Sequence, residues 1–435
     1  MLSKSSPWIG VAALTVGSAT LGWCWIVRLR RTQQRSQMND IAIVSAYEAL
    51  IGNTPLVKLS TLSRLVGRSV YVKMESLNPG GTGKDRAALG MIRAAEASGY
   101  LPKGGNGTKS TGNSAPVERE SSDPFDSIIS KAMRRSKTGG LVVEGTSGST
   151  GIALASLCQR RGHACVVVLP DDQASEKQRI LEALGAETYV VSNAAIANPN
   201  HYVNVARRLA VRANELGTVR AVFIDQFENV SNFDTHYEQT GPELWRQCKN
   251  LDAFVMSSGT GGTIAGIGRF LKEKHVSVKV VLVDPPGSAL YHKIQHGVAF
   301  ANQQRERELK RHRYDTLAEG IGLDRVTNNL ALGVDFIDSA IRVMDQEAVD
   351  MAHWLLANEG LWVGSSSAMN VVGAVRVALQ LPSKSTIVTI ICDAGQRHVT
   401  RFWNRDFILS RGLEWPGDCE RIPGCIQNIE GSAAL

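Results

Sequence analysis

Apolar runs rich in β-branched residues recur along the 435-residue chain and alternate with stretches of helical periodicity. Parallel strands that are buried on both faces and joined by helices have this pattern. The expected strands are residues 70–74, 141–145, 164–170, 186–191, 221–225, 253–257, 278–284 and 386–392. The pattern predicts the α/β class. The length suffices for two lobes around a shared cleft.

The composition is that of an ordinary globular protein, with 43% hydrophobic and 20% charged residues. The net charge is +7, but residues 1–40 hold five Lys or Arg and one Asp, so the remainder carries little excess. Clustered basic charge that would bind nucleic acid is therefore not indicated. The seven cysteines contain no CxxC pair and no zinc-site spacing. We expect reduced thiols, a cytosol-like compartment and no bound metal.

The amino terminus contains an uncharged run of 20 residues, 8–27, about the number that a helix needs to cross a bilayer. Tryptophans lie near both ends of the run, and arginines follow it directly. A cleaved secretory signal is the alternative, but the run exceeds the usual apolar region of about 7 to 15 residues and its positive charge follows it. We expect residues 1–40 to be a membrane anchor and linker, with the rest of the chain facing the cytosol.

The remainder divides into a folded unit, expected over residues 41–415, and a C-terminal tail over 416–435. Within the folded unit, residues 104–140 are rich in Ser, Gly and charge and contain a single aromatic residue, which predicts a largely disordered insertion. The polar stretch 303–313 predicts an exposed helix.

A glycine-rich loop between an expected strand and an expected helix, SSGTGGTIAG at 257–266, is suited to binding an anion. Glycines let the backbone approach an oxyanion, and threonine hydroxyls add donors. The candidate residues are Gly259, Thr260, Gly261, Gly262 and Thr263. Phosphate is the expected ligand, although such turns also serve simple packing. A dinucleotide fingerprint lacks its last glycine because Ile264 stands there, which argues against NAD.

A second glycine-rich turn, NPGGTGKDR at 78–86, places Lys84 at the start of an expected helix. Asn78 and Asp85 depart from the Walker A pattern, which argues against ATP. Desolvation and the positive helix end both disfavour the ammonium form, so a neutral amine could form a Schiff base with an aldehyde. An ordinary surface lysine is the alternative. Together with a phosphate cradle, such a lysine indicates pyridoxal phosphate.

A third loop, TSGSTG at 146–151, offers hydroxyls and backbone N–H groups suited to a carboxylate beside that lysine. With this loop the chain resembles the cysteine synthase and cystathionine β-synthase family, the β-family of fold type II pyridoxal-phosphate enzymes, and most of all its fungal membrane-anchored cysteine synthases. The resemblance runs from about residue 51 to 404. Its further motifs are IGNTPLV at 51–57, KQRILEALGAE at 177–187, DQFENVSNFDTHYEQTGPELW at 225–245, EGIG at 319–322 and CDAGQRH at 392–398.

The resemblance implies roles for particular residues. Lys84 is the expected Schiff-base lysine and moves the proton at the substrate α-carbon, and the loop from Gly259 to Thr263 cradles the phosphate. The residues expected to bind the substrate carboxylate are Thr146, Ser147, Thr150 and Gln226. Ser366 is expected to pair with the pyridine nitrogen and, lacking a negative charge, to leave it unprotonated, which favours β-elimination.

Two positions depart from the family pattern. Ser149 stands where the family usually has an Asn that contacts the cofactor 3′ oxygen, so the contact is either made by the hydroxyl or weakened. Ala368 stands where a glycine is usual, and its methyl group is either tolerated or tightens the pocket.

The resemblance implies a cysteine synthase that converts O-acetyl-L-serine and sulfide into L-cysteine and acetate. A cystathionine β-synthase-like or serine-deaminating enzyme and a membrane-tethered, non-catalytic scaffold are the alternatives. Relatives imply two α/β lobes, the smaller drawn from residues 75–200, and a homodimer. The arginine-flanked span resembles anchors of the mitochondrial outer membrane, and the endoplasmic reticulum is the alternative.

Overall fold

The computed structural model describes residues 46–104, 123–301, 316–417 and 423–425. The chain divides into two units, residues 1–49 and 50–435, and only the end of the first is described. Among the described residues, no helix combines the length and apolar character needed to cross a membrane. The expected span 8–27 and the expected helix 303–313 lie outside the described residues, as does most of the tail 416–435.

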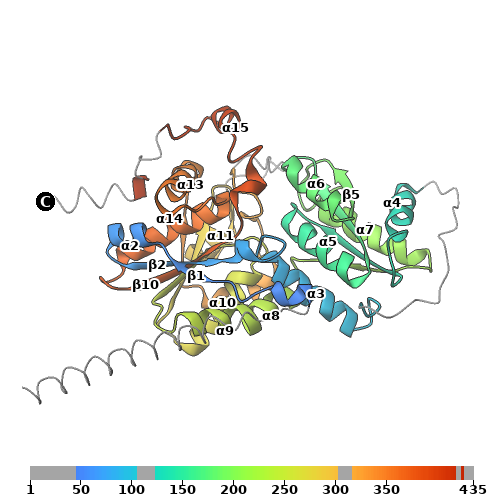
Figure 1. The fold of residues 1–435 in the computed structure, drawn as a ribbon, viewed down its shortest axis with the longest axis horizontal. Helices are drawn as coiled ribbons and strands as arrows, with labels where there is room; N and C mark the ends of the chain where they lie inside the picture. The colour runs from blue at the N-terminus through green and yellow to red at the C-terminus, as the bar shows by residue number, and fades with distance from the viewer. Residues whose placement is uncertain (1–45, 105–122, 302–315, 418–422, 426–435) are drawn as a thin grey trace, which may run out of the picture. The chain divides into compact units, whose positions relative to one another are not determined.

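Two separate sheets confirm the α/β class (Figure 1). The larger has six strands in the order β1-β2-β10-β7-β8-β9, and β1 pairs with β2 in the antiparallel sense while the other pairs are parallel. Its strands are β1 (Leu56–Lys58), β2 (Ser69–Met74), β7 (Ala253–Ser257), β8 (Lys279–Asp284), β9 (Ser339–Arg342) and β10 (Thr386–Ile391).

Helices cover both faces of the larger sheet. On one face, α2 and α13 pack with α14, a helix that is buried over almost its whole length. On the other face lie α9, α10 and α11. The helical segments are η1 (Tyr47–Leu50), α2 (Ser60–Val66), η2 (Glu75–Leu77), α3 (Lys84–Ala97), α8 (Ser231–Thr235), η3 (His236–Thr240), α9 (Gly241–Gln247), α10 (Gly262–Lys274), α11 (Leu290–His296), α12 (Asn328–Ala331), η6 (Val334–Phe336), α13 (Asp345–Glu359), α14 (Ser365–Gln380), η7 (Gly395–His398) and α15 (Arg405–Ser410).

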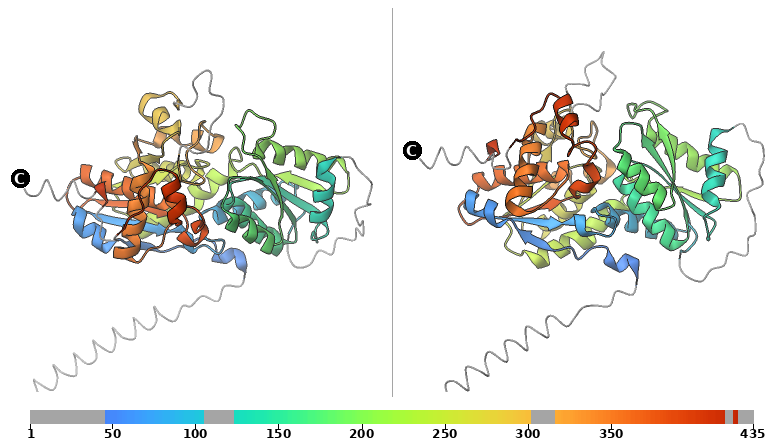
Figure 2. Two further views of the ribbon diagram at one scale, coloured as in Figure 1. Left: turned by 90° about the horizontal axis from the view of Figure 1, so that it is seen from above. Right: turned by 45° about the horizontal axis from the view of Figure 1, so that its top comes forward.

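The smaller sheet has four parallel strands in the order β5-β4-β3-β6. Helices α5 and α6 lie on one face, and α4 and α7 lie on the other (Figure 2). These elements are β3 (Gly140–Gly145), β4 (Ala164–Pro170), β5 (Glu187–Val191), β6 (Arg220–Phe223), α4 (Pro124–Met133), α5 (Ser149–Arg161), α6 (Ser175–Ala183) and α7 (Tyr202–Glu215). Strand β6 extends this sheet beyond residue 200, so the expected limits of the smaller lobe were too narrow.

All eight expected strands are present, with ends that agree within two residues. Strands β1 and β9 were not expected from the sequence; they have three and four residues and lie at the two edges of the larger sheet. Short edge strands carry too few residues to show a clear apolar pattern.

The expectation of disorder over 104–140 is wrong for its second half. Asp123 caps α4 by accepting a hydrogen bond from the Phe125 N–H over 2.9 Å, and a proline occupies the first helical turn. Ile129 and Ala132 are buried against the smaller sheet. Two apolar contacts one turn apart therefore hold a helix that the composition of residues 104–140 did not indicate. Residues 105–122 lie outside the described part.

Candidate active site

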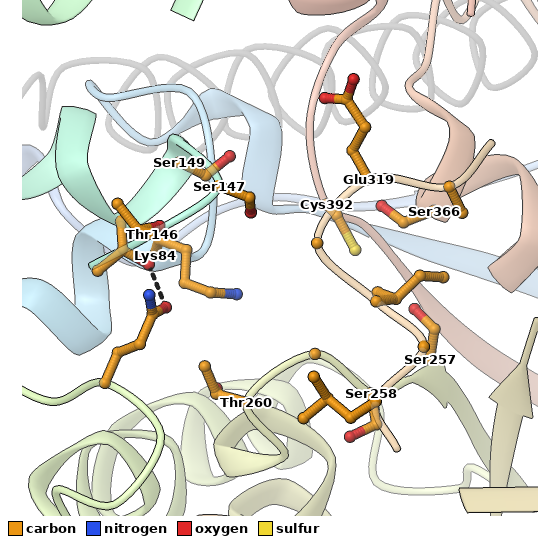
Figure 3. Close-up of a pocket in the computed structure, with 18 of the residues that line it drawn as sticks. Lys84, Thr146, Ser147, Ser149, Ser257, Ser258, Thr260, Glu319, Ser366 and Cys392 are labelled. Atoms are coloured by element: carbon orange, nitrogen blue, oxygen red, sulfur yellow. Dashed lines mark hydrogen bonds between the residues drawn. The ribbon is translucent and has the colours of Figure 1, made fainter. Parts of the chain in front are cut away.

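A cavity of about 210 Å³ is lined by loops that follow strands of both sheets, at the carboxyl ends where α/β folds bind ligands (Figure 3). Nearly all residues singled out from the sequence line it. They are Lys84, Thr146, Ser147, Ser149, Thr150, Gln226, Gly259, Thr260, Gly261, Thr263 and Ser366. Gly262 is the exception: it is buried at the start of α10, where a Cβ would overlap the Asn232 side chain.

Lys84 is the first residue of α3, and its amino group points into the cavity (Figure 3). Its backbone N–H donates to the Thr82 hydroxyl over 3.1 Å, which fixes the start of the helix. Burial lowers the pKa of the Lys84 amine, although the nearby Cys392 and Asp393 act in the opposite direction. The position at a helix start and the direction of this pKa shift both favour the neutral form of the amine.

A buried ionic network lies beneath the start of α3. Arg86 pairs with Glu75 and with Glu243, both over 2.8 Å, and Lys73 pairs with Glu243 over 2.5 Å. Burial alone would raise the pKa of Glu243, but the hydrogen bonds and charges of Arg86 and Lys73 lower it to about 2. The network ties α3 to β2 and α9, so it holds the helix that presents Lys84.

The glycine loop follows β7 and opens α10. Gly261 has φ of +87°, a conformation that side chains rarely adopt, and a Cβ there would lie 2.5 Å from Leu330 Cβ. In the part of the chain that the structure describes, no side chain caps this helix start, so its first N–H groups are available to an anion. Packing and anion binding thus both explain these glycines.

The TSGSTG loop follows β3 and opens α5. Gly148 has φ of +128°, and the Thr146 hydroxyl accepts a hydrogen bond from its N–H over 3.2 Å. The Thr150 hydroxyl donates to the Gln226 side-chain oxygen over 2.5 Å. Among the described residues no side chain caps the α5 start either, so its first N–H groups can bind a second anion.

Ser366 lies in the first turn of α14, beside Cys392. Burial raises the pKa of the Cys392 thiol to about 11, so the thiol is neutral at this wall. Ala368 is fully buried in the hydrophobic core and does not line the cavity, so the packing of α14 accommodates its methyl group.

The sequence analysis matched the EGIG and KQRILEALGAE motifs but gave their charged residues no role. Glu319 forms an ion pair with Lys177, and the Arg401 Nε lies 3.3 Å from Glu319. These three side chains line the cavity and connect α6, beside the smaller sheet, to loops of the larger one. His236 was also missed and hydrogen-bonds to Thr263 over 3.1 Å. The sequence signal that could have identified Lys177, Glu319 and His236 was their place in the matched motifs at 177–187, 319–322 and 225–245.

The cavity's donor groups fit pyridoxal phosphate. Within the described ranges, the buried hydroxyls of Ser257 and Ser258 on the glycine loop find no hydrogen-bond partner. Two uncapped helix starts and a lysine of lowered pKa face the same space. The hydroxyls and a helix start complement the cofactor phosphate, and the lysine complements its aldehyde. The second helix start complements the carboxylate of an amino-acid substrate.

Comparisons with known proteins agree with this site. The family model described as pyridoxal-phosphate-dependent enzyme matches residues 47–116 and 124–393. Cysteine synthase 2 of Schizosaccharomyces pombe is 42% identical, over 94% of this chain and 96% of its own. The putative mitochondrial cysteine synthase of Saccharomyces cerevisiae is 44% identical, over 82% of this chain and 83% of its own length.

Among solved structures, O-ureido-L-serine synthase superposes with a TM-score of 0.65 at 26% identity, covering 86% of this chain and 98% of its own. The fold of O-ureido-L-serine synthase therefore extends over most of this chain. The site, the family match and the relatives together show that this chain belongs to the pyridoxal-phosphate-dependent enzymes of fold type II, within the cysteine synthase and cystathionine β-synthase family.

Proposed function

We propose that this enzyme is a cysteine synthase that replaces the acetate of O-acetyl-L-serine with sulfide to form L-cysteine. The observation that carries the proposal is the buried Lys84 amine facing two uncapped helix starts across one cavity. The relatives named cysteine synthase support the same reaction.

The proposed roles follow from the contacts. The backbone from Gly259 to Thr263, at the start of α10, holds the cofactor phosphate. The side chains and N–H groups at the start of α5, from Thr146 to Thr150, hold the substrate carboxylate, and Gln226 orients Thr150. Ser366 offers an uncharged hydroxyl to the pyridine nitrogen.

Lys84 acts as the base. Because burial lowers the pKa of its amine, a larger fraction is neutral near pH 7 and can accept the proton from the substrate α-carbon. Bound pyridoxal phosphate supplies an electron sink for the charge left on that carbon. The network around Arg86 keeps α3, and with it the Lys84 amine, in one position.

Ser149 is proposed to contact the cofactor in place of the Asn that is usual in the family. It is the first residue of α5 and lines the cavity, and its hydroxyl has a shorter reach than an Asn side chain. This departure is the observation behind the alternatives, a cystathionine β-synthase-like or serine-deaminating enzyme or an inactive scaffold. The presence at the cavity of every other predicted site residue except Gly262 argues against the scaffold.

The test is a competition between donors. The purified full chain, loaded with pyridoxal phosphate, is given O-acetylserine with sulfide, serine with homocysteine, or serine alone, and the products are identified by mass spectrometry. Cysteine as the dominant product supports the proposal, and Lys84→Ala serves as the inactive control. Dominant cystathionine or pyruvate would overturn the cysteine synthase assignment, and no product from any pair would favour the scaffold.

We further propose that residues 8–27 anchor a homodimer in the mitochondrial outer membrane, with residues 41–415 in the cytosol. The arginines that follow the uncharged span, and the relative named as mitochondrial, support this location. Carbonate extraction and protease treatment of intact mitochondria test it. Release by carbonate would exclude the anchor. Co-fractionation with the endoplasmic reticulum would assign the anchor to that membrane instead. Light scattering of the detergent-solubilised chain tests the dimer, and the mass of one chain would exclude it.

A further inference from the structure

Two buried polar side chains, one helical turn apart, support the glycine loop from behind. Asn232 Nδ2 donates to the Thr260 hydroxyl oxygen over 2.9 Å. His236 Nε2 lies 3.1 Å from the Thr263 hydroxyl oxygen. Both threonines line the cavity, and the two supporting residues are at most 2% exposed. A single helical segment, α8 with η3, therefore contacts both hydroxyls of the proposed phosphate cradle.

Tight packing fixes this segment against α10. A Cβ at Gly266 would lie 2.9 Å from His236 Cβ and 2.7 Å from the Phe233 carbonyl oxygen, so only glycine fits. η3 is a π-helix, in which the Gly241 N–H donates to the His236 carbonyl. Such single π turns often occur at functional sites. Here the turn places His236 and Thr240 within hydrogen-bond distance of each other.

The hydrogen bonds of His236 determine which ring nitrogen carries the proton. Its Nδ1 lies 3.0 Å from the hydroxyl oxygen of Thr240, which is fully buried. In the described part of the chain this hydroxyl has no other partner, so it must donate to Nδ1 to avoid a buried unpaired donor. Burial lowers the pKa of His236 to about 3, so the ring is neutral and its proton is on Nε2.

The same reasoning fixes the two cradle hydroxyls. The Nε2–H of His236 donates to Thr263 Oγ1, and an amide NH₂ group such as that of Asn232 can only donate. The hydroxyl oxygen of Thr260 therefore accepts a hydrogen bond from Asn232, and that of Thr263 accepts one from His236. The hydroxyl hydrogen of each threonine remains available to donate to a group in the cavity.

We propose that Asn232 and His236 are positioning residues that make Thr260 and Thr263 hydrogen-bond donors to the cofactor phosphate. The chain of donors runs from Thr240 through His236 to Thr263 and ends on a phosphate oxygen. Donors set in advance bind the phosphate without the cost of reorienting them. This inference rests on the proposed phosphate site.

The test compares variants that keep or remove the donor at the position of Nε2. His236→Phe removes it, whereas His236→Gln keeps an amide N–H for Thr263 and a carbonyl for Thr240. Thr240→Val frees the ring to change tautomer, and His275→Gln, at an exposed position, is the control. The readouts are the dissociation constant for pyridoxal phosphate, the ³¹P chemical shift of the bound phosphate, and the ¹⁵N shifts of the histidine ring in the full chain.

We expect His236→Phe to weaken cofactor binding about tenfold or more, the size of one hydrogen bond to a charged group, and to move the ³¹P signal. His236→Gln should restore most of both, and the wild-type ring should carry its proton on Nε2 before the cofactor is added. Equal binding by the Phe and Gln variants, or a proton on Nδ1 in the wild type, would overturn the proposal. A wild-type chain that binds no cofactor would instead refute the proposed phosphate site.

Discussion

The Thr150 hydroxyl donates to the Gln226 side-chain oxygen over 2.5 Å and so joins the start of α5 to the segment that follows β6. The Gln226 amide nitrogen in turn donates to Glu144 over 3.1 Å and to the Gly145 carbonyl over 3.3 Å. Burial and the charge of Asp225 raise the pKa of Glu144 well above its ordinary value. Two predicted substrate-binding residues are thus held together before a substrate arrives.

Thr150→Val should raise KM for the amino-acid substrate by up to about tenfold, since it removes the neutral hydrogen bond, worth about 0.5–1.5 kcal/mol, that fixes Gln226 beside the start of α5. Cofactor binding should stay unchanged because Thr150 belongs to the carboxylate site. Steady-state kinetics and a cofactor titration measure the two effects, with Thr218→Val at an exposed position as the control. An unchanged KM would remove Thr150 from the substrate site.

Ser149→Asn restores the side chain that is usual in the family. If the serine only weakens a contact, the variant should bind pyridoxal phosphate equally or up to about tenfold more tightly and keep at least the wild-type activity. Equilibrium dialysis and kcat/KM with O-acetylserine measure both. Lower activity with O-acetylserine but not with another donor would show that Ser149 is adapted to a different substrate.

Glu243→Gln should destabilise the protein by about 3–5 kcal/mol, because it leaves Arg86 and Lys73 incompletely paired in the interior. The pKa of Glu243 is lowered to about 2 in the folded protein, from an ordinary pKa of 4.5. The carboxylate therefore stabilises the folded state fully at pH values above about 4.5. That contribution should be lost as the pH falls from about 4.5 towards 2. Urea unfolding at several pH values measures this dependence.

The matched control for that change is Glu238→Gln, at an exposed position one helical turn before Glu243. It should alter the free energy of unfolding by less than about 0.5 kcal/mol. Equal effects of the two substitutions would mean that the buried network contributes no specific stability.

Lys177→Met should loosen the contact between the two sheets over the cavity. The lysine stem passes over Gly148, where a Cβ would lie 2.6 Å from Lys177 Cδ, and its ammonium pairs with Glu319. Methionine keeps most of the stem but not the charge. Hydrogen exchange should become faster in α6 and KM should rise, whereas Lys177→Arg should retain the wild-type values. Unchanged exchange in the Met variant would show that the pair does not hold the sheets together.

The sequence predicted those features that depend on neighbouring residues along the chain. Lys84, the TSGSTG loop and the glycine loop each follow a strand and open a helix, and this arrangement is visible in residue types and spacing alone. Since the carboxyl ends of parallel strands lie at one edge of each sheet, the three loops could be expected to share a site.

Contacts between distant segments could not be predicted in the same way. Lys177 and Glu319 are 142 positions apart, and nothing in either motif identifies the other as its partner. His236 supports Thr263 only because a π turn and the glycine at 266 bring two helices close together. Helix α4 was missed because the polar residues around it dominate the composition of 104–140 and concealed its apolar segment, PFDSIISKAM.

The most direct test of the central claim is the visible absorption of the full chain reconstituted with pyridoxal phosphate, recorded as O-acetylserine and then sulfide are added. We predict a band from the cofactor bound through Lys84 that changes with O-acetylserine and returns with sulfide as cysteine is released. Lys84→Ala should lack both the initial band and the turnover, while Lys58→Ala, at an exposed position, should behave as the wild type. A wild-type band that O-acetylserine leaves unchanged, or cysteine formation that survives in Lys84→Ala, would contradict the account.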